Sequence, residues 1–260
     1  MEQTVSWMEG ISTEQRLQWL RQYNDFSEEA GAPLCRYELG QRALCRDVLE
    51  EYGLDQVVQG KSGLERMFAL LDWVCGAFRH EGVGRLPAER DPRAIVEQCK
   101  AEGGTNCRGL SLLLAQLLRA YGTPARHVTC LPYQDVFRDC HVVVEAYWRE
   151  QGQWVMLDPT YCLAVRDGTG RWLSLWDLRK AIEQGGALVP RETICYNGGP
   201  YTMEEYRAYM AKNLFRFALV KELVHGGDGE QTLLEPRGYS SELVPQQERS
   251  HSAAAFWAAP

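Results

Sequence analysis

Apolar residues recur at helical spacing through the first third of the chain. The segment 13–16 resembles a capped helix start and is followed by apolar residues. A second helical pattern begins with Ser62 as its cap and extends to Val74. Residues 81–92 hold two glycine-containing breaks and two prolines, which indicates a loop, and a short helix is expected over 95–100. The pattern therefore predicts a helical N-terminal third.

The pattern changes after the glycine pair at 103–104. A strong helical repeat covers 107–121, with leucines on its apolar side, and it stops at Gly122 before Thr-Pro. Segments rich in β-branched residues then predict three strands, over 126–131, 141–148 and 154–157. Residues 151–153 indicate a hairpin turn between the last two strands. A helix followed by antiparallel strands is typical of an α+β fold.

Beyond Tyr161 the periodicity is weaker. Helices are expected over 172–182 and 203–217, and the second is rich in aromatic residues. From about His225 onward, glycines and scattered polar residues leave two alternatives open. This last stretch forms either ordered strands against the core or a partly loose tail.

Composition and charge exclude several classes of protein. The 260 residues are 45% hydrophobic and 24% charged, which is typical of a globular protein and not of a disordered or fibrous chain. There is no apolar run of membrane-spanning length and no signal-peptide pattern, so a cytoplasmic location without a membrane partner is expected. The net charge of −7 and the scattered basic residues argue against nucleic acid as a partner.

The chain contains nine cysteines, which is an odd number, and no Cys-x-x-Cys pair. A disulfide framework is therefore not expected in a reducing compartment. A structural zinc site is not expected either, because its ligands normally come in close pairs. Most of these cysteines are expected to be small buried hydrophobic residues.

Cys107 differs from the others in its sequence context. It follows Gly-Gly-Thr-Asn and opens the apolar helix, so unpaired N–H groups and the helix dipole would stabilise its thiolate. A nucleophilic cysteine also needs a base that is oriented by a third group. His141 opens one predicted strand and Asp158 closes the next. Antiparallel strands joined by a tight turn can bring such ends together, and all three residues meet if the helix packs on this sheet.

These residues resemble the transglutaminase-like superfamily. The resemblance covers about residues 64–165 and is carried by three segments, GGTNCRGLSLLLAQLLRAYGTPARHV, CHVVVEAYW and QWVMLDPTY. It implies a papain-like core and acyl transfer from an amide through a thioester, with no cofactor and no metal. It also implies that Cys107 is the nucleophile, that His141 is the general acid and base, and that Asp158 orients the imidazole. Members include amine-transferring transglutaminases, peptidases and peptide N-glycanases.

The expected architecture is an α+β, papain-like transglutaminase core in which the cysteine-bearing helix packs on an antiparallel sheet. The expected divisions are an N-terminal helical extension over 1–60, a catalytic core over 61–165 and a C-terminal extension over 166–260 that packs on the core. The expected function is cysteine-dependent acyl transfer on peptide or glutamine amides, by hydrolysis or by transfer to an amine. The alternative is a non-catalytic peptide- or protein-binding module on the same fold. A third hypothesis is a peptidase whose tail docks a partner, and the oligomeric state is left open.

Other candidate residues carry weaker signals. The backbone N–H of Cys107 is a natural oxyanion donor, whereas Gln98, the nearest upstream glutamine, is not favoured as the second one. Asp135 and Asp139 precede the strand of His141 and rank below Asp158 as the orienting acid.

The remaining candidates are expected to be structural. Cys140 should point away from the face that His141 uses. His80 and His127 have no nearby acidic or cysteine pattern, so structural or surface roles are expected. Residues 225–230 lack the alternating carboxylates of a calcium loop and are expected to form a turn. Five aromatic residues are expected to pack in the core, namely Tyr201, Tyr206, Tyr209, Phe215 and Phe217.

Overall fold

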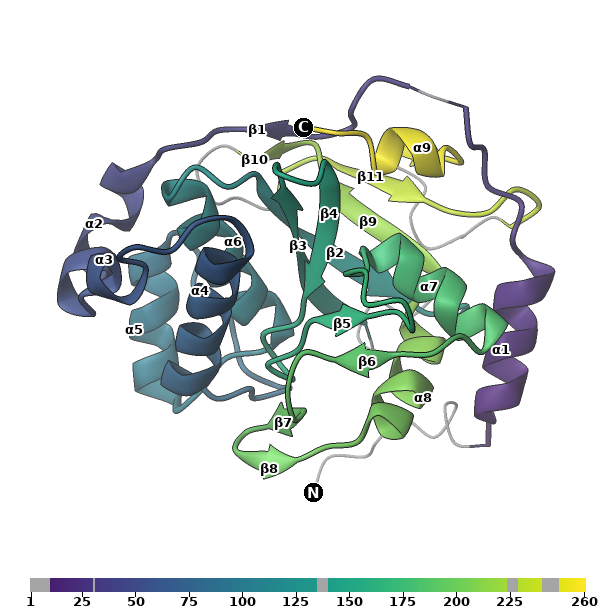
Figure 1. Cartoon of the computed structure of the whole chain (residues 1–260), viewed down its shortest axis with the longest axis horizontal. Helices are drawn as coiled ribbons and strands as arrows, with labels where there is room; N and C mark the ends of the chain where they lie inside the picture. Colours follow the sequence, from purple (N-terminus) through teal and green to yellow (C-terminus); the bar gives the residue numbers. More distant parts are fainter. Residues whose placement is uncertain (1–9, 30, 135–139, 224–228, 240–247) are drawn as a thin grey trace.

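A six-stranded sheet forms the centre of the computed structural model, which describes residues 10–29, 31–134, 140–223, 229–239 and 248–260 (Figure 1). The strand order is β12-β11-β9-β2-β3-β4, and every pair is antiparallel except β11 with β12. These strands are β2 (Ala125–Leu131), β3 (His141–Trp148), β4 (Gln153–Leu157), β9 (Arg216–Val220), β11 (Gln231–Leu234) and β12 (Glu248–Ser250).

Helices cover both faces of this sheet, as Figure 1 shows. In the first half of the chain the helices are α1 (Thr13–Gln22), α2 (Arg42–Glu51), α3 (Leu54–Val57), α4 (Gly63–Ala77), α5 (Pro92–Glu102) and α6 (Cys107–Ala120). Later in the chain come α7 (Leu175–Gln184), α8 (Met203–Asn213) and α9 (Ala253–Phe256). Short two-residue strands are β1 (Arg36–Tyr37), β5 (Val165–Arg166), β6 (Val189–Pro190), β7 (Cys195–Tyr196), β8 (Gly199–Pro200) and β10 (Glu222–Leu223). The mixed α+β arrangement predicted from the sequence is confirmed.

The apolar core is divided by the sheet into two clusters. Alternate side chains of a strand point to opposite faces. Val144 and Ala146 of β3 accordingly pack in the cluster formed with α2–α6, whereas Val143 packs in the cluster formed with α1, α7 and α8. A sheet covered on both faces needs strands that are apolar nearly throughout. This explains the unbroken valine run of β3.

Helix α6 is the central helix of the first cluster and confirms the predicted cysteine-bearing helix. Asn106 is its N-cap, and the side-chain Oδ1 accepts a hydrogen bond from the backbone N–H of Gly109 (3.1 Å). Every residue from Gly109 to Ala120 is buried, because α4 and α5 pack on one side and strands β2 and β3 on the other. The helix that carries Cys107 is therefore held rigidly against the sheet.

Two of the predicted elements need correction. The helix expected over 203–217 ends at Asn213, and residues 216–220 form strand β9 between β2 and β11. All five residues of β9 are buried and the strand is paired on both edges, which outweighs the helical pattern expected up to Phe217. The first helix begins one residue earlier than expected, because Ser12 is its N-cap and accepts from the N–H of Gln15.

The C-terminal part of the chain continues the central sheet. Strand β9 pairs with β2, and β11 and β12 extend the sheet beyond it. Of the two alternatives for the last stretch, the described residues 229–239 and 248–260 form ordered strands and a helix against the core. His225 lies outside the described residues. The sheet thus crosses the boundary expected at residue 165.

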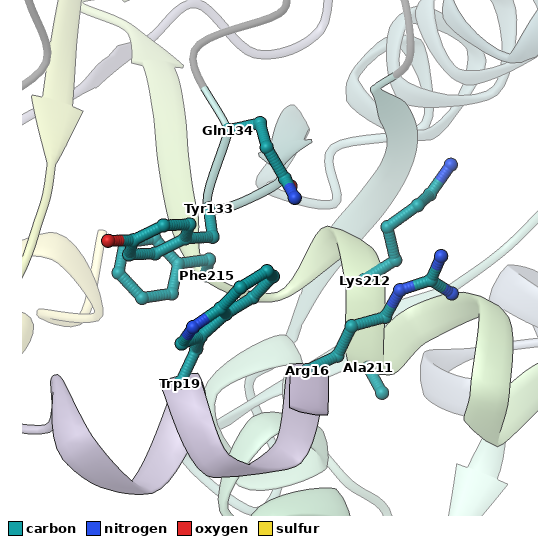
Figure 2. Close-up of a pocket in the computed structure, with 7 residues that line it drawn as sticks. All are labelled: Arg16, Trp19, Tyr133, Gln134, Ala211, Lys212 and Phe215. Atoms are coloured by element: carbon teal, nitrogen blue, oxygen red, sulfur yellow. The ribbon is translucent and has the colours of Figure 1, made fainter. Parts of the chain in front are cut away.

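Helix α1 packs, through aromatic side chains, in the core cluster that also contains α7 and α8 (Figure 2). Trp19 stacks on Tyr133, with ring centroids 4.4 Å apart and planes inclined by 18°. Tyr133 in turn meets Phe215 edge to face, at a centroid distance of 5.0 Å. Contacts of this geometry are favourable beyond the burial of apolar area. The N-terminal helix therefore belongs to the second core cluster, and not to the α2–α6 cluster that follows it in sequence.

A buried ion pair joins the chain's C-terminal end to the sheet. Arg126 of β2 and Glu145 of β3 are opposite each other in register, and Arg126 Nη2 donates to Glu145 Oε2 at 2.7 Å. The other carboxylate oxygen of Glu145 accepts from the N–H of Leu175 and from Nε1 of Trp257, each at 2.8 Å. Arg126 also donates to the carbonyl of Phe256 (2.7 Å). Strands β2 and β3, the start of α7 and the end of α9 are thus joined by hydrogen bonds to this one ion pair.

We expect Glu145→Ala to lower the free energy of unfolding by about 3–5 kcal/mol, because it leaves the buried Arg126 without its counter-ion. Chemical denaturation followed by circular dichroism measures this change. The matched control is Glu97→Ala, which removes the exposed i,i+4 partner of Arg93 and should cost at most about 1 kcal/mol. Equal losses in the two variants would contradict a central role for Glu145.

Candidate active site

Cys107 is the first residue of α6 and is partly exposed. Two side chains of the same helix dock its first turns onto the sheet. Arg108 donates from Nη2 to Oγ1 of Thr129 in β2 (3.0 Å), and Ser111 Oγ donates to the carbonyl of Val142 in β3 (2.9 Å). The start of α6 is therefore fixed beside the start of β3, where His141 lies. The first N–H groups of a helix have no acceptor within the helix, and the backbone N–H of Cys107 is one of them.

The register of β3 and β4 brings His141 and Asp158 together. Val144 lies opposite Leu157, so the next position in register places Asp158 opposite Val143. Asp158 is then the diagonal neighbour of His141 on the same face of the sheet, within reach of a histidine ring. His141 Nε2 lies 2.7 Å from Asp158 Oδ2, and both side chains are buried. The pairing expected from the sequence is present in the structure.

The buried carboxylate of Asp158 has three hydrogen-bond donors. Besides His141, the phenol of Tyr206 donates to Oδ2 at 3.0 Å, and the N–H of Thr160 donates to Oδ1 at 3.0 Å. Burial and the adjacent carboxylate raise the pKa of Tyr206 well above its ordinary value, so its hydroxyl stays protonated and acts as a donor. Hydrogen bonds of this kind stabilise a carboxylate that has no access to water. Sequence reasoning assigned Tyr206 to core packing only.

Cys107 and His141 form a hydrogen-bonded pair with opposing pKa shifts. Because Nε2 of His141 is bound to Asp158, its Nδ1 is the nitrogen that faces the sulfur. Burial acts to raise the pKa of Cys107, but hydrogen bonds and positive charge from His141 and His80 outweigh burial and lower it to about 6. Burial acts to lower the pKa of His141, but Asp158 and Cys107 outweigh burial and raise it to about 10. These shifts favour a thiolate and an imidazolium near neutral pH.

His80 lies beside the same sulfur, which corrects the structural or surface role expected for it. Its side chain hydrogen-bonds Cys107, and its Nδ1 lies 3.0 Å from Oη of Tyr196. His80 and Tyr196 are far apart in sequence, and neither shares a motif with Cys107. Only the path of the chain brings them together, so periodicity and spacing offered no signal for His80.

The backbone around His80 is attached to the segment that precedes Cys107. Residues 79–81 bridge to Thr105, whose N–H donates to the carbonyl of Arg79 (3.1 Å) and whose carbonyl accepts from Glu81 (2.8 Å). A Cβ at Gly104 would lie 2.8 Å from the Arg79 carbonyl, so this close approach requires glycine. On the other side, Asn197 exchanges two hydrogen bonds with the backbone of His80 (2.8 and 2.9 Å).

The other candidates lie away from the sulfur or outside the described residues. Gln98 donates to Glu102 on the exposed face of α5 and takes no part in the site. Asp135 and Asp139 belong to the undescribed residues. Tyr209 lies at the site, since its ring centroid is 5.2 Å from that of His141, whereas Phe215 and Phe217 pack in the core as expected.

Two further findings concern ligands and membranes. Among the residues that the structure describes, His, Cys, Asp and Glu side chains form no group of three or more that could hold a metal ion. Within the same residues, no helix combines the length and the apolar character that crossing a bilayer requires.

Comparison with known proteins gives a family match for the central segment. Residues 51–159 match the model of the Transglutaminase-like superfamily. A sequence comparison with curated proteins gives no match. Among solved structures, the chain is similar to a candidate cysteine protease from Cytophaga hutchinsonii, with 17% identity, a TM-score of 0.37, and coverage of 66% of this chain and 58% of that one. It is also similar to a TGase, with 14% identity, a TM-score of 0.33, and coverage of 59% and 34%. The chain thus spans less than two thirds of the length of either protein.

We expect the alkylation rate of Cys107 by iodoacetamide to rise with pH around a midpoint near 6. In His141→Ala the midpoint should move upward, because the imidazolium that stabilises the thiolate is removed. Peptide mass spectrometry of protein quenched at each pH measures the rate at every cysteine, and the buried Cys99 serves as an internal control. The same midpoint in wild type and His141→Ala would contradict the pair.

Proposed function

We propose, from the match of residues 51–159 to the Transglutaminase-like superfamily and from the geometry of the site, that the protein is a cysteine-dependent acyl-transfer enzyme. Its substrates would be peptide or glutamine amides of a peptide or protein partner. The observation that carries the proposal is the placement of one imidazole between a sulfur and a buried carboxylate. His141 hydrogen-bonds Cys107, and its other nitrogen bonds Asp158 at 2.7 Å.

The proposed reaction has two halves that use the same groups in opposite directions. The thiolate of Cys107 attacks the amide carbonyl, and a tetrahedral intermediate with a C–S bond and an oxyanion forms. His141 gives its Nδ1 proton to the leaving nitrogen, the C–N bond breaks, and a thioester remains. Water or an amine then attacks the thioester while His141 takes up its proton. The product is an acid or a new amide, and the thiolate is released.

Asp158 would orient the imidazole and stabilise its cation throughout this cycle. It is buried, and its hydrogen bonds from Tyr206 and Thr160 hold both carboxylate oxygens in place. A carboxylate so held fixes the tautomer and direction of His141 without taking the proton itself. Tyr206 would therefore act as a positioning residue, since it touches Asp158 and not the reacting atoms.

The oxyanion needs donors directed at the place where charge develops. The backbone N–H of Cys107 at the start of α6 supplies one. We assign the second to His80. Its Nδ1 is hydrogen-bonded to the Tyr196 hydroxyl, which leaves Nε2–H as the donor on the side of the sulfur. A donor on this side of the sulfur would reach the oxygen of a carbonyl under attack.

We expect Cys107→Ala to abolish hydrolysis of activated esters and of glutamine-containing peptides. Asp158→Ala should lower kcat/KM at least about a hundredfold, because the imidazolium loses its orienting group. Steady-state kinetics measure both changes, and an added primary amine separates transfer from hydrolysis by the mass of the product. Cys99→Ala, which removes a buried thiol outside the site, is the matched control. A wild-type protein that forms no acyl-enzyme but binds peptides would favour the non-catalytic binding module.

The donor role of His80 predicts a difference between two substitutions. His80→Ala should lower kcat about 10²–10³-fold, whereas His80→Gln, which keeps a side-chain N–H, should stay within about tenfold of wild type. Turnover is compared at alkaline pH, where the thiolate forms in every variant, and alkylation of Cys107 confirms this. If His80 acted as a second base, the glutamine variant would be as slow as the alanine variant.

A further inference from the structure

A second pair of cysteines lies at the turn that follows Asp158. Cys75 is in the last turn of α4, and Cys162 is four residues beyond Asp158. The Sγ atom of Cys75 is 3.3 Å from the carbonyl oxygen of Pro159, and that of Cys162 is 3.6 Å from Oδ1 of Asp72. Asp72 and Cys75 are neighbours on one helix face, and Pro159 and Cys162 belong to one turn. Because each sulfur contacts the segment that carries the other, the two thiols lie side by side, and a hydrogen bond joins them.

The pKa values of the two thiols are shifted in opposite directions. The hydrogen bond from Cys75 lowers the pKa of Cys162, and the positive charge of Arg191 acts in the same direction. Burial and Asp72 oppose this shift, but Arg191 also pairs with Asp72, with 3.2 Å between Nη1 and Oδ2. The same hydrogen bond, together with burial, raises the pKa of Cys75. Cys162 is therefore the thiol of the pair that loses its proton more readily, and Cys75 is the one that holds its proton more tightly.

Small molecules can reach this pair through a cavity of about 430 Å³. Cys75 and Cys162 both line it, together with Cys195. The backbone of Cys162 has φ +50°, a left-handed conformation that is unfavourable for a residue with a side chain. Such a conformation persists only where its surroundings impose it, and here it turns the thiol toward α4. An accessible thiolate beside a second thiol is the arrangement that two-electron oxidants convert to a disulfide.

We propose that Cys75 and Cys162 form a dithiol that peroxides oxidise to a disulfide. The thiolate of Cys162 attacks one oxygen of hydrogen peroxide, the O–O bond breaks, and hydroxide leaves and takes up a proton to become water. Cys162 is then a sulfenic acid. The sulfur of Cys75 attacks the Cys162 sulfur and loses its proton, the S–O bond breaks, and a second water leaves. Two thiols are oxidised by two electrons, and one peroxide is reduced to two waters.

The disulfide would tie the Asp158 turn to α4 across 87 positions of the chain, from residue 75 to residue 162. Closing so long a loop restricts the unfolded chain. Oxidation should therefore raise the thermal unfolding midpoint by on the order of 5–10 °C. This inference does not depend on the proposed acyl transfer, because Cys107 takes no part in it.

The test treats the full chain with stoichiometric hydrogen peroxide, blocks remaining thiols with N-ethylmaleimide and digests the protein with trypsin. The expected product joins peptide 67–79, whose one cysteine is Cys75, to peptide 150–166, whose one cysteine is Cys162. Cys107→Ser is treated in parallel, so that oxidation of the active-site thiol cannot account for the result. A disulfide of Cys162 with Cys195 in place of Cys75 would overturn the proposed pair.

Two single variants identify the attacking sulfur. In Cys75→Ser, Cys162 should accumulate as a sulfenic acid that dimedone labels, whereas in Cys162→Ser no label should appear at Cys75. The thermal midpoint should rise on oxidation in wild type and Cys107→Ser but not in either single variant, with circular dichroism confirming that each is folded. Dimedone labelling of Cys75 in Cys162→Ser, or an unchanged midpoint in oxidised wild type, would refute the proposal.

Discussion

The buried carboxylate of Asp158 is the constraint on which the rest of the site depends. A negative charge without access to water is costly unless donors surround it, and here His141, Tyr206 and Thr160 supply them. Meeting that requirement fixes the ring of His141, which in turn fixes the nitrogen presented to Cys107. The charge that stabilises the imidazolium is also what raises the pKa of His141 and, through it, lowers that of Cys107. One buried charge thus sets the geometry and the protonation of its neighbours.

Two of the three donors to this carboxylate come from parts of the chain that the family match does not include. The match ends at residue 159, but Thr160 follows it directly, and Tyr206 belongs to α8. Tyr196, which holds His80, lies in β7. The C-terminal part also supplies β9, β11 and β12 of the central sheet. It therefore completes the core and the surroundings of the site together, which a separately folded appendage would not do.

Local pattern predicted the elements that carry the candidate triad because each has a single local cause. The leucine repeat after Asn106 predicts α6, and the valine run after His141 predicts a strand buried on both faces. Where two causes compete, the prediction failed. Residues 216 and 217 end the segment expected to be helical, yet they belong to a strand that pairs on both edges, because the edge of β2 offers hydrogen bonds that an isolated helix segment cannot match.

By itself, the sequence determined the helix of Cys107, the strands of His141 and Asp158 and, through a tight turn, the register that pairs the last two. These are short-range consequences of periodicity, capping and strand pairing. Tertiary structure alone decided that His80 and Tyr206 meet the site and that Cys75 faces Cys162. Such contacts join segments tens of residues apart, and their positions follow from how α4 and α8 pack on the sheet. Packing depends on the whole core, so no local pattern along the chain encodes it.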